Sequence, residues 1–334
     1  MTQEDAAKST ESNSLVKRTS KGLITSKGRR SQISLTSDII RAAAIARTSS
    51  QALVDESWMQ EIWDWADKYE LPEDVIPRDS VALLALESLS IREYDISFLP
   101  ENIGRLSNLK SFHDWNSKLI SLPDSIGDLK NLETLGIVND RGRLPLLPDS
   151  IGKLSNLKKL YISNNRLTTL PSSIGDLSNL KLLEICSNKF DSFPEDIERL
   201  KNLEVLYMSS NRFSSLPKWI GSLSNLKNLY ISDNEFKSLP DCIVKLKNLE
   251  KLHISHASLK SLPESIGDLS KLKVLDISFN SFKLPLEGIE GLKNLEVLIF
   301  HGNNPKSLPK NIDFDKVRLE LDYESIPQII TQIL

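Results

Sequence analysis

Three side chains suited to acid–base chemistry recur at one fixed spacing in the second half of the chain. Tyr230, His253 and Asp276 follow one another at intervals of 23 residues. If these positions fall on neighbouring strands, the phenol, the imidazole and the carboxylate lie about 5 Å apart. An imidazole beside a carboxylate is the arrangement of a general base and its orienting acid. A hydrolytic or metal-dependent enzyme at His253 and Asp276 is therefore one hypothesis.

Other signs of catalysis are missing from the sequence. No phosphate-binding GxxxxGK(S/T) or GxGxxG pattern occurs, and no CxxC or HExxH spacing indicates a metal site. No nucleophile accompanies the histidine–aspartate pair. All four histidines fall in strand or strand-end positions of the repeat described next, at His113, His253, His256 and His301. We therefore expect no catalytic residue, no metal and no cofactor.

The spacing of 23 residues comes from a tandem repeat, whose clearest unit is Leu157–Asn179, LKKLYISNNRLTTLPSSIGDLSN. Counted from the leading leucine, positions 4 and 6 are apolar. They face the core of a short strand and leave positions 3, 5 and 7 on the opposite face. Stacked units then pair in parallel, and the SSIGDLSN segment is predicted to form one or two helical turns. Nine further units begin at Leu86, Leu109, Leu132, Leu180, Leu203, Leu226, Leu249, Leu272 and Leu295.

Asparagine recurs at position 9, where each strand ends and the chain turns inward. A side-chain amide both donates and accepts hydrogen bonds, so it can satisfy backbone groups buried at such a turn. Ser117 and Ala257 interrupt the series. The ladder asparagines are Asn165, Asn188, Asn211, Asn234, Asn280 and Asn303.

The consensus LxxLxIxxNxLxxLPxxIGxLxN, seen at Leu157–Asn179 and again at Leu203–Asn225, identifies the chain as a member of the leucine-rich repeat proteins. It resembles the plant intracellular Ras-group-related repeat class, and bacterial proteins of that repeat type are similar. Trp65–Ile91 looks like the leading segment of the bacterial members. The resemblance implies an α/β solenoid, a horseshoe with a concave parallel sheet, and roles in scaffolding and protein recognition through the concave face.

Four regions are predicted along the chain. Residues 1–37 are a Ser/Thr-rich basic tail, interpreted as disordered, with a translocation signal or a basic arm as alternatives. Residues 38–80 form a helical N-terminal cap, and residues 81–315 hold about ten repeats. Residues 316–334 offer one more strand and a C-terminal cap.

The cap is predicted to contain two helices, over about 38–47 and 50–69. Trp58, Ile62 and Trp65 share one stripe of the second helix. Because the first repeat of a stack has an apolar end to cover, capping is the favoured role, with an aromatic partner-binding surface as the alternative. Extended chain is expected to follow Pro77.

Three units depart from the consensus. Asp114 stands where an aliphatic residue belongs, and because a carboxylate in a core is costly, a local shift of register is expected there. The excess residues around Asn139–Arg143 predict a protruding loop. In the unit at Leu272 the Leu284–Pro285 pair comes one residue early, which predicts a small rearrangement.

Composition excludes several partner classes. A net charge of −3 and a pI near 5.9 give no general attraction to nucleic acid or to an anionic membrane. No apolar run approaches the roughly 18 residues of a membrane span, and no secretory signal is seen. Cys186 and Cys242 fall on different faces, so a disulfide is not expected. We expect a cytoplasmic protein, or alternatively one translocated into a host cell.

The sequence favours a non-enzymatic scaffold that recognises a protein or peptide with its concave sheet. Tyrosine is a residue type favoured in binding hot spots, and it recurs at position 5 among scattered charges of both signs. A secreted bacterial effector that uses the same surface is the alternative. Partner identity and oligomeric state stay open. The candidate partner-binding residues are Trp115, Tyr161, Arg166, Glu184, Tyr207, Arg212, Tyr230, Asp233, His253 and Asp276.

Overall fold

The computed structural model describes residues 56–139, 143–282, 286–303 and 316–320. The predicted tail, the predicted helix over 38–47 and most of the C-terminal cap lie outside the described residues. The early Leu284–Pro285 pair lies outside them as well. The four predicted region boundaries stay predictions.

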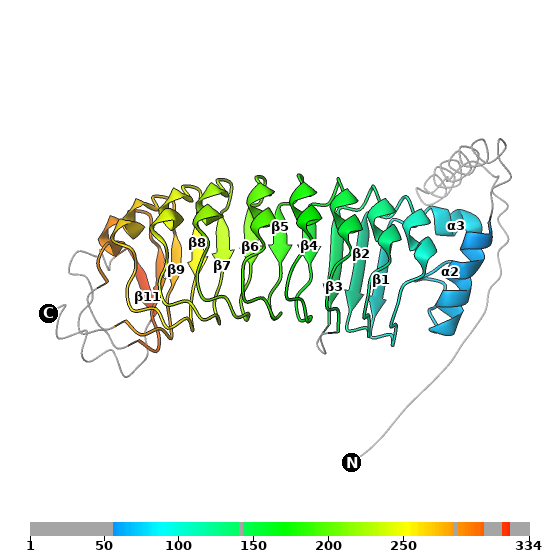
Figure 1. The fold of residues 1–334 in the computed structure, drawn as a ribbon, viewed down its shortest axis with the longest axis horizontal. Helices are drawn as coiled ribbons and strands as arrows, with labels where there is room; N and C mark the ends of the chain where they lie inside the picture. Colours follow the sequence, from blue (N-terminus) through cyan, green and yellow to red (C-terminus); the bar gives the residue numbers. More distant parts are fainter. Residues whose placement is uncertain (1–55, 140–142, 283–285, 304–315, 321–334) are drawn as a thin grey trace, which may run out of the picture. The chain divides into compact units, whose positions relative to one another are not determined.

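One parallel sheet runs through the described repeats, and its strands follow one another in chain order (Figure 1). Every strand pairs with the strand of the next unit at the same repeat position, as Leu160 does with Leu183. The predicted leucine-rich repeat fold is therefore confirmed. The strands are β1 (Ser88–Arg92), β2 (Ser111–Trp115), β3 (Thr134–Val138), β4 (Lys159–Tyr161), β5 (Leu182–Glu184), β6 (Val205–Tyr207), β7 (Asn228–Tyr230), β8 (Lys251–His253), β9 (Val274–Asp276), β10 (Val297–Ile299) and β11 (Arg318–Glu320).

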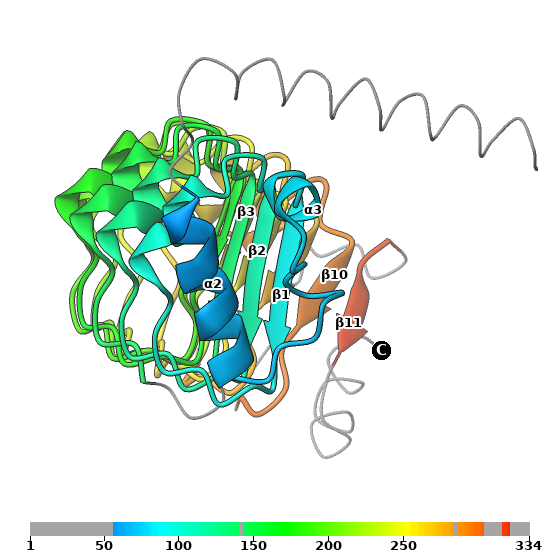
Figure 2. The same cartoon turned by 90° about the vertical axis from the view of Figure 1, so that its right-hand side faces the viewer.

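Short 3-10 helices form the second layer, on one side of the sheet (Figure 2). They occupy the SSIGDLSN segments, as the repeat pattern predicts. Up to η8 each follows a proline, whose fixed φ prepares the turn. They are η1 (Glu101–Arg105), η2 (Asp124–Asp128), η3 (Asp149–Lys153), η4 (Ser172–Asp176), η5 (Glu195–Arg199), η6 (Lys218–Ser222), η7 (Asp241–Lys245), η8 (Glu264–Asp268) and η9 (Ile289–Gly291).

The core lies between the two layers. Leu183 and Ile185, at positions 4 and 6 of one unit, are fully buried. Ile174 of the preceding 3-10 helix, η4, is fully buried in the same core. Positions 3, 5 and 7 point the other way, because side chains alternate along a strand. We call the surface that these three positions form the open face.

The predicted asparagine ladder is confirmed. The Asn211 side-chain amide donates to the backbone carbonyls of Ile185, Met208 and Ser209 at 3.0–3.3 Å. Its oxygen accepts from the Phe190 amide at 3.2 Å. One buried side chain thus satisfies four backbone groups of two units, which explains why asparagine recurs there.

Helix α2 (Ser57–Lys68) lies at the β1 end of the repeats and packs against η1 (Figure 2). Trp58, Ile62 and Trp65 are buried, as their helical spacing predicts. The Trp65 indole donates to the Phe98 carbonyl at 2.9 Å, and the Trp63 indole donates to the Pro77 carbonyl at 2.8 Å. The helix therefore contributes both apolar side chains and hydrogen bonds to its contact with the segments that follow it.

The prediction of extended chain after Pro77 is wrong. Helix α3 (Ser80–Leu84) forms there, and the first strand begins only at Ser88. Asp79 caps this helix, since its carboxylate accepts from the Ala82 amide at 2.8 Å. This capping bond satisfies one of the amides in the first turn of the helix.

The expected register shift at Asp114 is also wrong. β2 keeps its register with β1 and with β3, and Asp114 is fully buried at its core position. The Ser117 hydroxyl donates to the Asp114 carboxyl at 2.6 Å. Burial raises the pKa of Asp114 to about 6, against the smaller opposing effect of that hydrogen bond. The hydrogen bond from Ser117 therefore offsets only part of the cost of burying the carboxyl, and β2 keeps its register despite that cost.

The predicted loop after β3 begins inside the protein. Asn139 is 1% exposed and does not protrude. Residues 140–142 lie outside the described residues, so the predicted protrusion of the remaining loop stays a prediction.

Candidate functional site

The position 5 side chains form one row across the open face. Strand register places Tyr161 beside Glu184, Glu184 beside Tyr207, and so on through Asp276. From Tyr161 to Asp276, every member of the row is half-buried. The repeat spacing therefore brings together the residues that the sequence predicts, although they lie more than 100 positions apart in the chain.

Three of these side chains stack ring on ring, and we call Tyr207, Tyr230 and His253 the central stack. The Tyr207 and Tyr230 ring centroids lie 4.4 Å apart, and those of Tyr230 and His253 lie 4.5 Å apart. Their planes differ by 21° and 13°. Burial, and then the neighbouring Tyr230 phenol, raise the pKa of Tyr207 above its ordinary value, so its hydroxyl stays protonated at neutral pH.

The His253–Asp276 pair is formed as the sequence suggests. His253 Nδ1 and Asp276 Oδ2 lie 3.3 Å apart. The Ser278 amide donates to Asp276 at 3.0 Å, and the Ser278 hydroxyl also donates to it. Burial acts to raise the Asp276 pKa, but the hydrogen bonds from His253 and Ser278 outweigh it, so the pKa lies below its ordinary value. The carboxylate stays charged and orients the imidazole within the stack.

The other end of the row is polar. The Ser163 hydroxyl donates to the Glu184 carboxylate at 2.8 Å. Burial, followed by the charge of Glu184, raises the pKa of Tyr161. Cys186 lies at position 7 of the next strand segment, and burial raises its pKa to about 11, so the thiol is protonated and unreactive.

The remaining candidates surround the row or lie apart from it. Arg166, Arg212 and Asp233 are exposed in the segments that follow β4, β6 and β7. Trp115 is 39% exposed at the end of β2, where it stacks on His113 with centroids 6.0 Å apart. Four strand spacings separate β2 from β6, about 19 Å, so Trp115 does not belong to the central stack.

A second aromatic contact was not predicted. His256 and Phe279 occupy position 8 of two neighbouring units, and their rings stack with centroids 4.3 Å apart. Phe279 is 48% exposed. The sequence carried a signal for this contact, because position 8 is asparagine, serine or aspartate in the four units before them.

A charged ladder along the strand starts was also not predicted. Position 2 holds lysine or glutamate, and the two alternate except at the neighbouring Lys158 and Lys181. Glu204 accepts from Lys227 at 2.7 Å, and Lys181 lies 3.2 Å from it. Lys158 and Glu133 pair at 2.9 Å, as do Lys273 and Glu250. These exposed pairs contribute little stability, but they neutralise this edge of the sheet.

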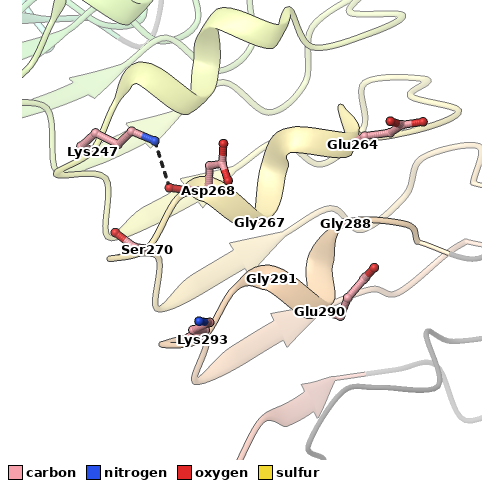
Figure 3. A pocket seen from close by; sticks show the side chains of 9 residues that line it. All are labelled: Lys247, Glu264, Gly267, Asp268, Ser270, Gly288, Glu290, Gly291 and Lys293. Carbon is pink, nitrogen blue, oxygen red and sulfur yellow. Dashed lines mark hydrogen bonds between the residues drawn. The ribbon is translucent and has the colours of Figure 1, made fainter.

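A hollow of about 660 Å³ lies on the opposite side of the molecule, between η8 and η9 (Figure 3). Lys247 donates to the Asp268 carbonyl at its rim at 3.3 Å. Gly267 and Gly291 meet at its floor so closely that an added Cβ on either lies 2.8 Å from the other's Cα. The glycines are explained by this close packing of backbones, and the side chains around the hollow are of both charges and mostly exposed.

Two further properties bear on the class of protein. Among the described residues, no group of three histidine, cysteine, aspartate or glutamate side chains could hold a metal ion. No helix in the same part of the chain is long and apolar enough to cross a membrane.

Comparison with known protein families identifies leucine-rich repeats in this chain. The family described as "Leucine-rich repeat region" matches residues 173–283 and 217–313, and "Leucine Rich Repeat" matches residues 156–177. No enzyme family is among these matches. No curated protein matches the chain.

Several solved structures are similar. A leucine-rich repeat protein from Leptospira interrogans is 31% identical with a TM-score of 0.53, over 71% of this chain and 73% of that chain. The Arabidopsis receptor kinase HAESA, in complex with the peptide hormone IDA and the co-receptor SERK1, is 23% identical with a TM-score of 0.60, over 80% of this chain and 49% of that chain. The Toll–Spätzle complex of Drosophila is 22% identical with a TM-score of 0.56, over 71% of this chain and 36% of that chain. The last two likenesses concern the fold alone, and this chain spans half or less of those chains.

Proposed function

The chain belongs to the leucine-rich repeat family, and we propose that it binds a protein or peptide partner through the open face, with the central stack at the middle of the contact. Leucine-rich repeat proteins are usually non-enzymatic protein-binding scaffolds. HAESA with its peptide hormone and Toll with Spätzle are structures of the same fold with protein or peptide partners. For the present chain, the nature of the partner is part of the proposal.

The observation that carries the proposal is the stacking of Tyr207, Tyr230 and His253. Aromatic side chains supply large contact area at a low cost in conformational entropy, which is why they are enriched in hot spots. Here each ring already stacks on its neighbour, with centroids 4.4–4.5 Å apart, before any partner protein is bound. Less ordering is then needed on binding, so more of the contact energy contributes to affinity.

The flanking charges support recognition of a polar or mixed surface. Glu184 and Asp276 lie at the two ends of the central stack, and Arg166 and Arg212 are exposed at the strand ends. A rim of mixed charge around an aromatic centre is the usual anatomy of a protein interface. Over the described strands, the open face has no continuous positive stripe of the kind that nucleic acid requires.

The enzyme hypothesis receives less support. His253 and Asp276 are in contact, but Asp276 is already engaged by Ser278, and no metal-binding group of three exists among the described residues. The effector hypothesis rests on residues 1–37, which lie outside the described residues. A cytoplasmic location and a location in a host cell both stay predictions.

The experiment is an affinity pull-down from a lysate of the source organism. Wild type is compared with the double variant Tyr207→Ala/Tyr230→Ala. The matched control is Lys218→Ala/Asp241→Ala, which changes exposed residues of η6 and η7 in the same two units on the opposite side. We expect the tyrosine variant alone to lose its partners. Retention of the same partners at equal strength by the tyrosine variant would show that the proposed centre is wrong.

A further inference from the structure

In most units the chain leaves the strand through a residue in the left-handed conformation at position 8. At position 8, most units hold a small or polar residue that tolerates this backbone, because a short polar side chain bonds locally. Phe279 departs from that rule with φ of 51°, whereas His256, which also has φ of 51°, is a residue type that adopts this conformation more readily. The non-glycine residues at this position with positive φ are Glu93, Asn116, Asn164, Ser187, Ser210, Asp233, His256 and Phe279.

Burial does not compensate for this backbone cost. A bulky residue in the left-handed region costs about 1–3 kcal/mol. Phe279 nevertheless leaves 48% of its surface exposed. The fold makes room for its ring, since a Cβ added at Gly302 would lie 2.2 Å from Phe279 Cδ1. An exposed aromatic ring held in a strained position is a mark of function rather than of packing.

Two carboxylates belong to the unit that precedes this aromatic pair. Asp233 holds position 8 of the preceding unit, also in the left-handed conformation, with φ of 54°. The Asp233 amide donates to the Ser255 carbonyl at 2.9 Å, and the next unit repeats this bond, so Asp233 and His256 sit about one strand spacing apart. Glu235 follows two residues later and is exposed.

The strand ends thus differ electrostatically from the strand starts. Glu133, Glu204 and Glu250 at the strand starts are each paired with a lysine. Within the described part of the chain, neither Asp233 nor Glu235 forms an ion pair, although Arg212 is exposed one unit earlier. The two carboxylates are therefore not engaged in direct ion pairs with described residues, although Arg212 holds the same repeat position as Glu235 in the preceding unit. We call Asp233, Glu235, His256 and Phe279 the exit corner.

We propose that the exit corner receives an arginine side chain of the partner. This inference rests on the proposed function and names the partner chemistry at one end of the same surface. A guanidinium is planar, so it can stack on the face of His256 that is turned away from Phe279 while its N–H groups pair with Asp233 or Glu235. A compact ammonium provides the charge but not the planar stacking. An acidic segment would be repelled by the two carboxylates, and a purely apolar segment would gain no charge pairing from them.

The test uses a displayed library of random dodecapeptides selected on the immobilised full chain. Enriched peptides are synthesised and their affinities measured, together with versions that carry citrulline in place of arginine. Citrulline keeps the planar shape and removes the charge. We expect arginine to be enriched and its replacement to weaken binding at least tenfold.

Protein variants then locate the contact. Asp233→Asn/Glu235→Gln and Phe279→Ser are each expected to weaken the selected peptides at least tenfold. Ser187 and Ser210 occupy the same backbone position as Phe279, so the serine variant should fold. Glu204→Gln, which changes a paired carboxylate at the strand starts, is the matched control and should change affinity less than twofold.

The outcomes separate the two proposals. A library that yields no arginine-bearing peptide overturns the inference, and so does binding that is insensitive to the exit corner variants. If Tyr207→Ala/Tyr230→Ala abolishes peptide binding while those variants do not affect it, the proposed function stands and the arginine site is refuted. If neither set of variants weakens the peptides, both proposals fail.

Discussion

Tyr230 stacks on His253 with ring centroids 4.5 Å apart, nearly the spacing between neighbouring parallel strands. The agreement has a simple cause, because the two residues hold the same position in consecutive units and pair directly across β7 and β8. Any two aromatic residues at position 5 of adjacent units are brought into contact this way. The repeat length thus determines which side chains form the open face.

The asparagine ladder leads to the first prediction. Asn211→Ala leaves several buried backbone groups without partners, at about 1–3 kcal/mol each before relaxation, so we expect a loss of about 3 kcal/mol of stability. Asn225→Ala is the control, because Asn225 is exposed and donates a single bond to the Lys201 carbonyl at 2.9 Å. It should cost about 1 kcal/mol. Urea unfolding midpoints measure both, and equal losses would contradict the assigned role of the ladder.

The buried carboxyl of Asp114 predicts a dependence of stability on pH. Its pKa is about 6 in the folded protein and about 3.9 in an unfolded chain. Between these values the folded protein retains a proton that the unfolded chain has released. Stability therefore falls as pH rises from about 4 to about 6, and the loss is complete above pH 6.

Asp114→Asn removes this titration while keeping the shape of the side chain and an oxygen that can accept from Ser117. The free energy of unfolding of the variant, minus that of the wild type, should increase by about 2–3 kcal/mol from pH 4 to pH 8. Chemical denaturation of both proteins at the two pH values measures the difference. Parallel pH profiles would mean that Asp114 does not titrate in this range.

The third prediction concerns Gly127, where two 3-10 helices pack backbone against backbone. A Cβ there would lie 2.2 Å from the Ser150 carbonyl oxygen, which is backbone and cannot move aside without shifting η3. We expect Gly127→Ala to destabilise the protein by about 1–3 kcal/mol. Glu198 holds the same repeat position with a side chain already accommodated, so Glu198→Ala should change the melting temperature little. Similar effects of the two substitutions would refute this packing explanation.

Much of the fold could be predicted from the sequence because each repeat unit specifies its buried face, its turn and its alignment with the next unit. Leu160 and Ile162 specify the inward face, Asn165 specifies the turn, and the period of 23 residues aligns these positions in most units. The neighbours in the position 5 row follow from the same period, which is why the sequence alone groups Tyr207, Tyr230 and His253. The partner-binding role of these residues stays a prediction.

Features that depend on single side chains could not be predicted in the same way. Asp114 keeps its register although burial raises its pKa, and the hydrogen bond from Ser117 that partly offsets this cost is not visible in a hydrophobic pattern. The short helix at Ser80 depends on one capping bond from Asp79. The His256–Phe279 contact requires knowing that position 8 adopts positive φ, which local propensity argues against for phenylalanine.

The central claim is that the tyrosines of the central stack carry the contact with the partner. Its most direct test is isothermal titration calorimetry of a captured partner with wild type, Tyr207→Ala/Tyr230→Ala and Lys218→Ala/Asp241→Ala, after thermal melts confirm that all three are folded. We predict that the tyrosine variant binds at least about 30-fold more weakly, a loss of about 2 kcal/mol, and that the control stays within about twofold of wild type. A tyrosine variant that binds as tightly as wild type would contradict the claim.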